Sequence, residues 1–369
     1  MRCLQMAGRK ERIEMGDGAG GELMRRMLSR TVLPNIRETA FGDLGDGLHP
    51  DLLDDSASVG DDLAFTIDGH TIWPLEFPGG DIGGLSIFGT VNDLAVVGAK
   101  PRAIALSMVL EEGLDLQLLE RISRSIGSAA KKADVTVVTG DTKVVEKGGV
   151  KGMVIATAGI GWRHELLSPC LERSWDMRLV SGKVGRRPRW LRDDSVMPGD
   201  HIILSGHIGD HGISVLSFRE GYGFETEVRS DVAPMNRLIE EAMRAGGIVA
   251  SKDLTRGGLA GGLNEWASKS RCDLLIDETL LPVREPVRSA CDMLGLDPYE
   301  IGNEGKVIIS VVDGFEDEVL RAVRSLEEGK EAVIIGQAVK GSGKVVLRTE
   351  VGGKRFMDPP YGDPVPRIC

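Results

Sequence analysis

The sequence lacks paired cysteines. Its 369 residues contain five cysteines, and no two of them form a Cys-x-x-Cys pair. An odd number of cysteines without short spacings argues against a disulfide framework and against a zinc site. Single cysteines are typical of proteins in a reducing compartment. We therefore expect a cytoplasmic protein.

Long apolar runs and an excess of positive charge are also absent. No apolar run approaches the ~20 residues that a membrane-spanning helix needs. The basic N-terminus has no apolar segment of the kind found in secretory signals, so residues 1–15 are expected to form a mobile leader, with Met6 and Met15 as alternative starts. The formal net charge is −11 and the pI about 5.2, which argues against a nucleic-acid partner.

Glycine, by contrast, is abundant. The chain has 49 glycines, about 13% of its residues, where ~7% is usual. Many lie in clusters such as "GDGAGG", "FPGGDIGG" and "TRGGLAGG". Such clusters allow sharp turns and a close approach of the backbone to a ligand.

Strand-like and helix-like segments alternate through both halves of the chain. In the first half, β-branched runs predict strands at 63–73, 135–140 and 150–162, and apolar periodicity predicts helices at 83–99 and 115–134. In the second half, strands are expected at 201–206, 306–314, 332–339 and 344–349, with helices at 233–247, 259–270, 285–295 and 317–328. The pattern predicts an α/β (α+β) protein with two domains, residues 16–165 and 198–350, each a mixed sheet packed with helices.

Two segments fall outside this alternation. Residues 168–192 have seven Lys/Arg against two Asp/Glu and little periodicity, so we interpret 166–197 as a linker with a basic surface insertion. A solvated loop is favoured there over a docking site for an acidic partner. Residues 351–369 end in "DPPYGDPVPRIC", which predicts an extended, flexible tail. Twelve such residues would reach about 37 Å.

Aspartates at loop and strand ends form the first candidate site. They comprise the run "LLDDSASVGDD", then Asp68, Asp93 and Asp141. Magnesium prefers hard oxygen ligands and keeps waters and phosphate oxygens in its shell, so the set favours a metal–nucleotide site. For any single aspartate, a capping or surface role is favoured instead.

Three shorter motifs could serve the same site. The "FPGGDIGG" loop precedes a helix and could cradle phosphate, although a plain tight turn competes on even terms. Lys143 in "TGDTK" could neutralise phosphate, with an ordinary surface lysine as the favoured alternative. Glu304 in "GNEGK" could act as a general base, against a turn carboxylate without chemistry. His207 and His211 lack a third ligand for zinc, so we expect them to position a loop or to cap a helix.

Taken together, these motifs resemble a known family. The run from "DDSASVGDD" to "NDLAVVGAKP", then "VTGDTKVV", "GDHG", "DLTRGGLA", "NEGK" and "PRIC", is similar to the HypE family of hydrogenase-maturation proteins, within the aminoimidazole-ribonucleotide-synthetase (PurM-like) superfamily. The resemblance covers about residues 16–369. It implies a homodimer paired through the N-terminal domains, with ATP and Mg²⁺ bound near the interface.

The resemblance also implies a reaction and its partners. A HypF-type carbamoyltransferase would place a carbamoyl group on the terminal thiol. ATP-dependent dehydration would turn this thiocarboxamide into a thiocyanate. The cyano group would pass to iron on a HypC–HypD complex, for the [NiFe]-hydrogenase centre. Another ATP-dependent superfamily enzyme that acts on a small molecule, and a non-enzymatic scaffold, remain as alternatives.

Carried over residue by residue, the resemblance assigns roles. Cys369 holds the reacting group, Glu304 takes an N–H proton and Lys143 contacts phosphate. The implied metal ligands are Asp55, Asp68, Asp93 and Asp141, and the implied nucleotide contacts are Asp68, Gly79, Gly80, Asp81, Asn92, Asp93, Gly140, Asp141 and Lys143. The chain departs from the family where Asp17 replaces a histidine, where the strand motif reads Ile-Asp-Gly at 67–69, and in its longer basic connection.

Overall fold

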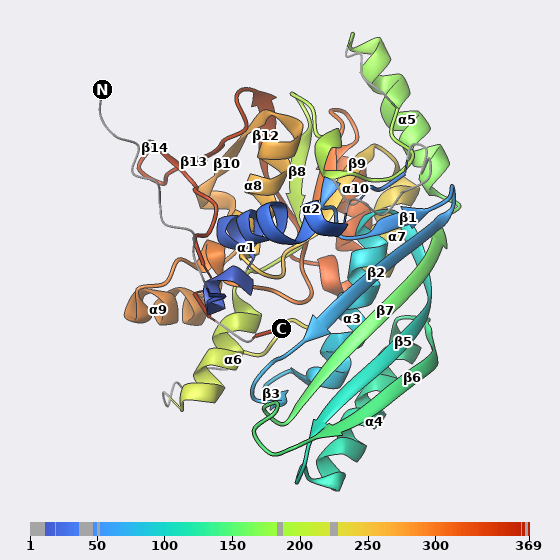
Figure 1. The fold of residues 1–369 in the computed structure, drawn as a ribbon. Helices are drawn as coiled ribbons and strands as arrows, with labels where there is room; N and C mark the ends of the chain where they lie inside the picture. Colours follow the sequence, from blue (N-terminus) through green and yellow to red (C-terminus); the bar gives the residue numbers. More distant parts are fainter. Residues whose placement is uncertain are drawn as a thin grey trace.

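A computed structural model describes residues 12–18, 20–36, 47–49, 52–182, 187–221, 228–362, 364–365 and 368–369. The expectations for residues 1–11, 183–186, 363, 366 and 367 lie outside the described residues. Two sheets with helices packed on them confirm the predicted mixed α/β class (Figure 1). Within the described part of the chain, none of the helices combines the length and apolarity needed to cross a bilayer.

The first sheet has five strands. Its order is β1 (Ala57–Val59), β2 (Leu63–His70), β7 (Met153–Arg163), β5 (Ala99–Glu111) and β6 (Thr136–Val145). All neighbours are antiparallel except β5 and β6, which are parallel. A short β3 (Glu76–Phe77) and β4 (Gly80–Asp81) pair separately. Beyond Phe65, the edge of β2 that pairs with β1 has no strand beside it among the described residues, and Thr66, Ile67 and Asp68 on this part of β2 line the cavity described below.

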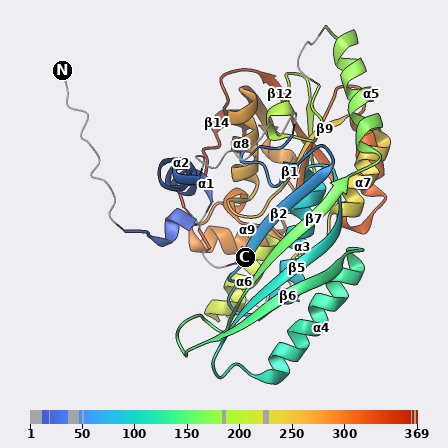
Figure 2. The same ribbon diagram turned by 45° about the vertical axis from the view of Figure 1, so that its right-hand side comes forward.

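Helices cover one face of this sheet. Helix α3 (Ile82–Val96) is almost wholly buried, and α4 (Leu116–Lys132) buries a stripe that includes Ile122, Ile126 and Ala129. Asp81 and Asp115 cap the two helices by accepting hydrogen bonds from Gly84 N and Gln117 N. The opposite face of β2, β7, β5 and β6 carries no helix among the described elements (Figure 2). We call this surface the open face.

The second sheet has seven strands. Its order is β14 (Lys354–Phe356), β13 (Val345–Arg348), β10 (Cys272–Asp277), β12 (Val333–Lys340), β8 (His201–Leu204), β11 (Val307–Val311) and β9 (Ile248–Asp253). Helices α7 (Asn236–Ala245) and α10 (Glu316–Arg324) pack on one face, and α8 (Gly258–Ser270) packs on the other. Helices α6 (Asp210–Glu220) and α9 (Glu285–Leu294) join the core of the first sheet.

The remaining elements are short. Near the N-terminus lie η1 (Met15–Gly18), α1 (Gly21–Met27), the π-helical η2 (Leu28–Val32) and α2 (Leu33–Ile36). Single 3₁₀ turns follow later, at η4 (Asp193–Ser195), η5 (Glu278–Leu280), η6 (Pro298–Glu300) and η7 (Glu327–Gly329).

The interpretation of residues 168–192 as a solvated insertion is wrong. Helix α5 (Leu167–Val180) occupies the first half and buries a helical stripe, at Leu167, Cys170, Leu171, Ser174 and Arg178. Further on, Trp190 and Leu191 are buried in the core shared with α3, α7 and α10. Apolar periodicity did not predict this helix, because two of its buried residues, Ser174 and Arg178, are polar.

The predicted tail is also less free than its composition suggested. Residues 354–356 form β14 at the edge of the second sheet. Beyond it Met357, Val365 and Ile368 are buried, and the chain returns to the junction of the two domains (Figure 1). The proline content therefore predicted that the tail is extended, but not that its end packs against the two domains.

The buried pair Arg178–Asp200 makes α5 testable. The Arg178 Nη2 lies 2.5 Å from Asp200 Oδ2, and both side chains are almost fully buried. Arg178→Ala leaves a buried carboxylate without its cation, so we expect it to lower the free energy of unfolding by about 3–5 kcal/mol in urea titrations. Arg187→Ala removes an exposed ion pair with Glu172 and should cost less than about 1 kcal/mol. Equal effects of the two substitutions would contradict the buried role of α5.

Candidate active site

A cavity of about 210 Å³ lies where the two domains and the C-terminus meet. Its lining comprises Asp55, Thr66, Ile67, Asp68, Asp93, Asp253, Thr255, Arg256, Glu304 and Cys369. Strand β2 and helix α3 contribute from the first domain. The end of β9 and the turn before β11 contribute from the second. We call this the acid cavity because five of its ten lining residues are carboxylic acids.

The sheet geometry aims the first two acids. On β2, the buried positions Ala64, Thr66 and His70 share the face that packs on α3, and Asp68 shares that alternation. Asp68 Oδ2 lies 3.5 Å from His70 Nε2. Asp93, near the end of α3, has its Oδ2 3.0 Å from the hydroxyl of Thr66.

Burial and neighbouring negative charges raise the pKa values of Asp93 and Asp253. Loss of hydration, followed by the charges of Asp253, Asp68 and Asp55, raises the pKa of Asp93 well above its usual value. A protonated Asp93 can donate to Thr66 Oγ1, whose own hydrogen then reaches the carbonyl of Asp55 at 3.0 Å. Burial, then Asp55, raises the pKa of Asp253 to about 8.

Two cations offset this negative charge. Lys252 is buried and its Nζ lies 2.6 Å from Asp55 Oδ1, with Asp193 and Glu265 also within ion-pair distance. Burial, as the largest cause, still raises the pKa of Asp55. Arg256 also lines the cavity and keeps an exposed surface, and the charge of Cys369 is the largest cause that raises the pKa of Arg256. More carboxylates than cations therefore face the cavity.

Hydrogen bonds to the main chain fix the position of Glu304. Its N–H donates to Asp231 Oδ1 at 3.0 Å, and the neighbouring Asn303 binds Gly209 N, Leu254 O and Ile301 O. The Glu304 side chain is 4% exposed. Burial, followed by the charges of Asp68 and Asp253, raises its pKa well above the usual value. A carboxylate with a raised pKa is a stronger base once it is deprotonated.

Five predicted site residues thus share the acid cavity: Asp55, Asp68, Asp93, Glu304 and Cys369. The structure also adds residues that the sequence reasoning missed. Asp253, Thr255 and Arg256 belong to "DLTRGG", which was quoted as a motif but given no role. An aspartate that ends a strand and is followed by arginine and paired glycines was the available signal.

The "FPGGDIGG" loop lies elsewhere and is packed against protein. A Cβ on Gly79 would meet Ser230 backbone atoms at 2.7 Å, and one on Gly80 would meet Val232 at 2.7 Å. Ile82 N donates to Leu75 O, and Gly84 N donates to Asp81. This helix N-terminus is therefore already occupied, and the tight-turn alternative describes its geometry. A part for Gly79, Gly80 and Asp81 in nucleotide binding stays a prediction.

Asn92 has a structural position. Its side-chain amide donates to Ala233 O at 3.1 Å, and its Oδ1 accepts from Met235 N at 2.7 Å. These bonds tie α3 to the segment that leads into α7. Asn92 does not line the acid cavity.

Asp141 and Lys143 are separated from the acid cavity. Asp68, Thr157, Leu106 and Gly140 form one row across the sheet. Asp141 is one residue further along β6, so its side chain points to the open face, and Lys143 shares that face. Three strand spacings, about 14 Å, also lie between β2 and β6. Both side chains are mostly exposed and form an ion pair of 3.7 Å.

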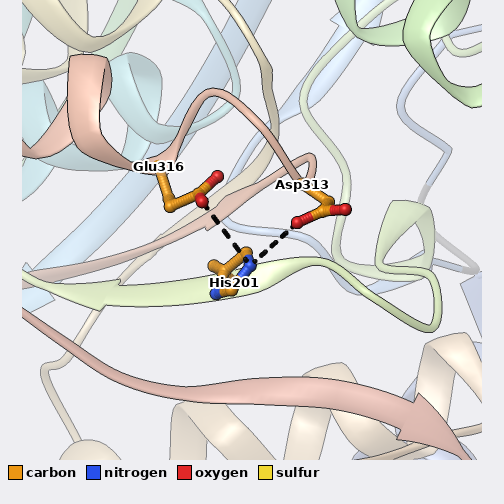
Figure 3. A group of neighbouring side chains, drawn as sticks. All are labelled: His201, Asp313 and Glu316. Atoms are coloured by element: carbon orange, nitrogen blue, oxygen red, sulfur yellow. Dashed lines mark hydrogen bonds and ion pairs between the residues drawn. The ribbon is translucent and has the colours of Figure 1, made fainter.

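Two other polar features lie outside the acid cavity. A cavity of about 530 Å³ lies on the other side of the Glu304 turn, and its walls mix basic and acidic side chains without any predicted site residue. His201, Asp313 and Glu316 lie at metal-ligand spacing between β8 and the start of α10 (Figure 3). His201 Nε2 is 3.3 Å from Asp313 and 4.0 Å from Glu316, which is accounted for by surface ion pairs. Neither feature contains the thiol.

The charge in the acid cavity predicts a pH-dependent stability. Asp253 has an ordinary pKa of 3.8 and a folded-state pKa of about 8. Between these values the native state holds a proton that the unfolded chain has lost, so stability falls as pH rises through this window. In EDTA, we expect Asp253→Asn to raise the Tm at pH 8 by about 2 °C or more, and by less at pH 5. Asp61→Asn is a matched exposed control. The same gain at both pH values would contradict this assignment.

Comparisons with known proteins agree with this geometry. Residues 53–162 match the AIR synthase related protein, N-terminal domain, and residues 197–348 match its C-terminal domain. A protein of Rhizobium leguminosarum bv. viciae named carbamoyl dehydratase HypE is 40% identical over 362 residues, which cover 97% of this chain and 95% of that protein.

Solved structures agree as well. A HypE structure in complex with ATP has a TM-score of 0.75 and 37% identity, over 97% of this chain and 100% of that one. The HypE chain of a HypE–HypF complex has a TM-score of 0.77 and 37% identity, over 89% of this chain and 100% of that one. The chain belongs to the HypE family of carbamoyl dehydratases, which is built from the two AIR synthase related domains.

Proposed function

We propose that this chain carries a carbamoyl group on the sulfur of Cys369 and uses ATP to dehydrate it to a thiocyanate. The cyano group then supplies an iron ligand of a [NiFe]-hydrogenase. The observation that carries this proposal is the position of the terminal residue: Cys369 lines the same small cavity as Glu304 and the acid cluster.

The chemistry explains why such a site is needed. Amide oxygen is a poor leaving group, so the carbamoyl oxygen first takes the γ-phosphoryl group of ATP, and the bond from that phosphorus to ADP breaks. The C–O bond then breaks with phosphate as the leaving group. Loss of both N–H protons leaves a C≡N bond on sulfur. ADP and phosphate thereby take up the elements of the lost water.

Glu304 is the proposed base for the nitrogen protons. It lies in the acid cavity with Cys369, and its backbone is fixed by Asp231. Its raised pKa makes the carboxylate strongly basic. Closure of the cavity around the loaded thiol would keep water from the activated carbon, which would otherwise hydrolyse.

The donor set of the acid cavity fits magnesium. Asp55, Asp68 and Asp93 repel one another when ionised, and a divalent cation relieves this repulsion. Among the described residues, the carboxylate oxygens of these three aspartates do not lie as close to one another as the ligand atoms of His201, Asp313 and Glu316 do. Wider spacing suits an ion that keeps waters and phosphate oxygens between carboxylates. When bound, Mg²⁺ would neutralise charge on the transferring phosphoryl group.

Arg256 is the cation that this chain itself places beside the reacting group. It lines the acid cavity with Cys369, whose charge is the main cause of its raised pKa. We assign it to stabilise negative charge that develops on the carbamoyl or phosphoryl oxygens.

A second copy of the chain is proposed to complete the ATP site. The acid cavity is smaller than the roughly 300–1,000 Å³ typical of ligand pockets, so it accommodates only the reacting end of ATP. Lys143 and Asp141 lie on the open face, together with exposed Phe65, Ile67 and Trp162. Ile67 also lines the acid cavity. A homodimer packed through the open face would therefore place nucleotide-binding groups next to the cavity.

Partners must reach Cys369 from outside. A HypF-type carbamoyltransferase would load the thiol, and a HypC–HypD complex would accept the cyano group. A HypE–HypF complex is known among the similar structures. We propose that the observed inward pose alternates with an outward pose for these two encounters.

Mass spectrometry of the C-terminal peptide tests the reaction. Carbamoylated protein with MgATP is expected to lose one water from Cys369. Glu304→Gln should slow this loss by about 10²-fold or more, because it removes the base. Glu300→Gln, four residues earlier and outside the acid cavity, should retain the wild-type rate. Absence of water loss in fully carbamoylated wild-type protein would overturn the proposal. Full ATP turnover by Cys369→Ala would instead favour an ATP-dependent enzyme that acts on a small molecule.

Light scattering with size exclusion tests the dimer. The wild-type chain should elute at about twice its mass of 39.7 kDa. Phe65→Glu places a charge on the open face and should yield the monomer, with loss of ATP-dependent dehydration. Leu116→Glu changes an exposed leucine on α4, away from the open face, and should remain dimeric. A dimer that tolerates Phe65→Glu would contradict this interface.

A further inference from the structure

The last two residues of the chain are held at two points, one from each domain. His211 Nε2, in α6, lies 2.6 Å from the carbonyl oxygen of Ile368. Thr71, directly after β2, donates its N–H to the main-chain oxygen of Cys369 at 3.0 Å. Both Figures 1 and 2 show the C-terminus between α6 and β2. We propose that His211 and Thr71 form a latch that positions the Cys369 sulfur in the acid cavity.

The hydrogen bonds of His211 define its protonation. The carbonyl of Ile368 can only accept, so Nε2 carries the hydrogen. Nδ1 then accepts from the hydroxyl of Ser230 at 2.7 Å. The ring is fully buried and burial lowers its pKa, so the neutral form is favoured. One neutral tautomer thus satisfies both nitrogens.

The surroundings fix this ring in place. Phe77 packs edge-on against it, with ring centroids 5.5 Å apart. Ser230 N donates to Pro78 O at 2.8 Å, so the residue that sets the tautomer is itself bound to the "FPGGDIGG" loop. His211 therefore needs no movement to receive the tail.

The side chain of Ile368 has a matching seat. It is 3% exposed and belongs to the core of the first domain. A Cβ on Gly302 would lie 2.8 Å from Ile368 Cδ1, and one on Gly212 would lie 3.5 Å from it. Gly212 follows His211, and Gly302 is two residues before Glu304. The seat is thus built from the same two segments that supply the latch and the base.

The latch answers a need that the tail creates. A Pro-rich segment gives reach but does not fix the position of its end. Two hydrogen bonds and one buried side chain, all within two residues of the sulfur, restrict the thiol to the cavity. Fixing a reactant in this way can supply much of a rate enhancement. The consequence for dehydration rests on the proposed function, whereas the latch itself does not.

Alkylation of Cys369 tests the latch without any turnover. With the tail docked, Cys369 is only partly exposed, so release of the tail should expose the sulfur and speed its reaction with iodoacetamide. Mass spectrometry of the C-terminal peptide separates this cysteine from the others. Burial raises the pKa of Cys170 to about 11 and of Cys291 to about 12, so both should react slowly.

His211→Leu is expected to raise the alkylation rate roughly three- to tenfold, the range for loss of one buried hydrogen bond. His211→Gln retains a donor near the Nε2 position and should restore most of the protection. His201→Gln, on β8, is the matched surface control and should behave as wild type. An unchanged rate in His211→Leu with an unchanged Tm would overturn the proposal.

A second measurement needs no substitution in the pocket. In ¹H–¹⁵N spectra of the histidine rings, the Nε2–H signal of His211 should shift or disappear when the chain is shortened to residues 1–367. An identical signal in both chains would overturn the latch even if His211→Leu failed to fold. A chain that shows the latch but no dehydration would contradict only the proposed function.

Discussion

The crowding of buried carboxylates at the domain junction is the constraint on which the site depends. Asp68 and Asp93 come from the first domain, while Asp253 and Glu304 come from the second. Burial, followed by the charges of neighbouring acids, raises the pKa values of Asp93, Asp253 and Glu304. Such a cluster opposes folding on its own. It is retained where a bound cation offsets the repulsion, as Mg²⁺ would do in the proposed ATP chemistry.

Lys252 explains how the protein tolerates this charge. Lys252 forms ion pairs with Asp55 and Asp193, and Lys269 forms ion pairs with Asp193 and Asp54. The loop before β1, the segment after α5 and helix α8 therefore meet in one ion-pair network. Trp266 Nε1 donates to Asp193 as well. The connection between the domains is therefore part of the support for the acid cavity, which a solvated linker could not provide.

The sequence predicted the fold class, together with the helices and strands whose apolar spacing is regular. It missed β5, an interior strand of the first sheet, because Pro101 and a register shift beside it interrupt the alternation. It also missed β9, whose six buried residues include Lys252 and Asp253. For the site, motifs identified the acids at strand ends, Glu304 and Cys369. They could not show that Asp141 and Lys143 point to the other face of the sheet, because that depends on pairing register across three strands.

The tail reconciles two opposed requirements. A thiol that visits other proteins must be able to leave, so its attachment has to be weaker than the packing of the core. A thiol that reacts in a cavity of 210 Å³ must be placed accurately while it is there. Two hydrogen bonds and the single side chain of Ile368 meet both demands, since each is modest alone and all act on the last two residues. The pairing of β14 with β13, earlier in the chain, limits the volume that the end of the tail can reach, but it does not fix the position of the sulfur. Reach is therefore set by the prolines, and placement by the groups that receive the end of the chain.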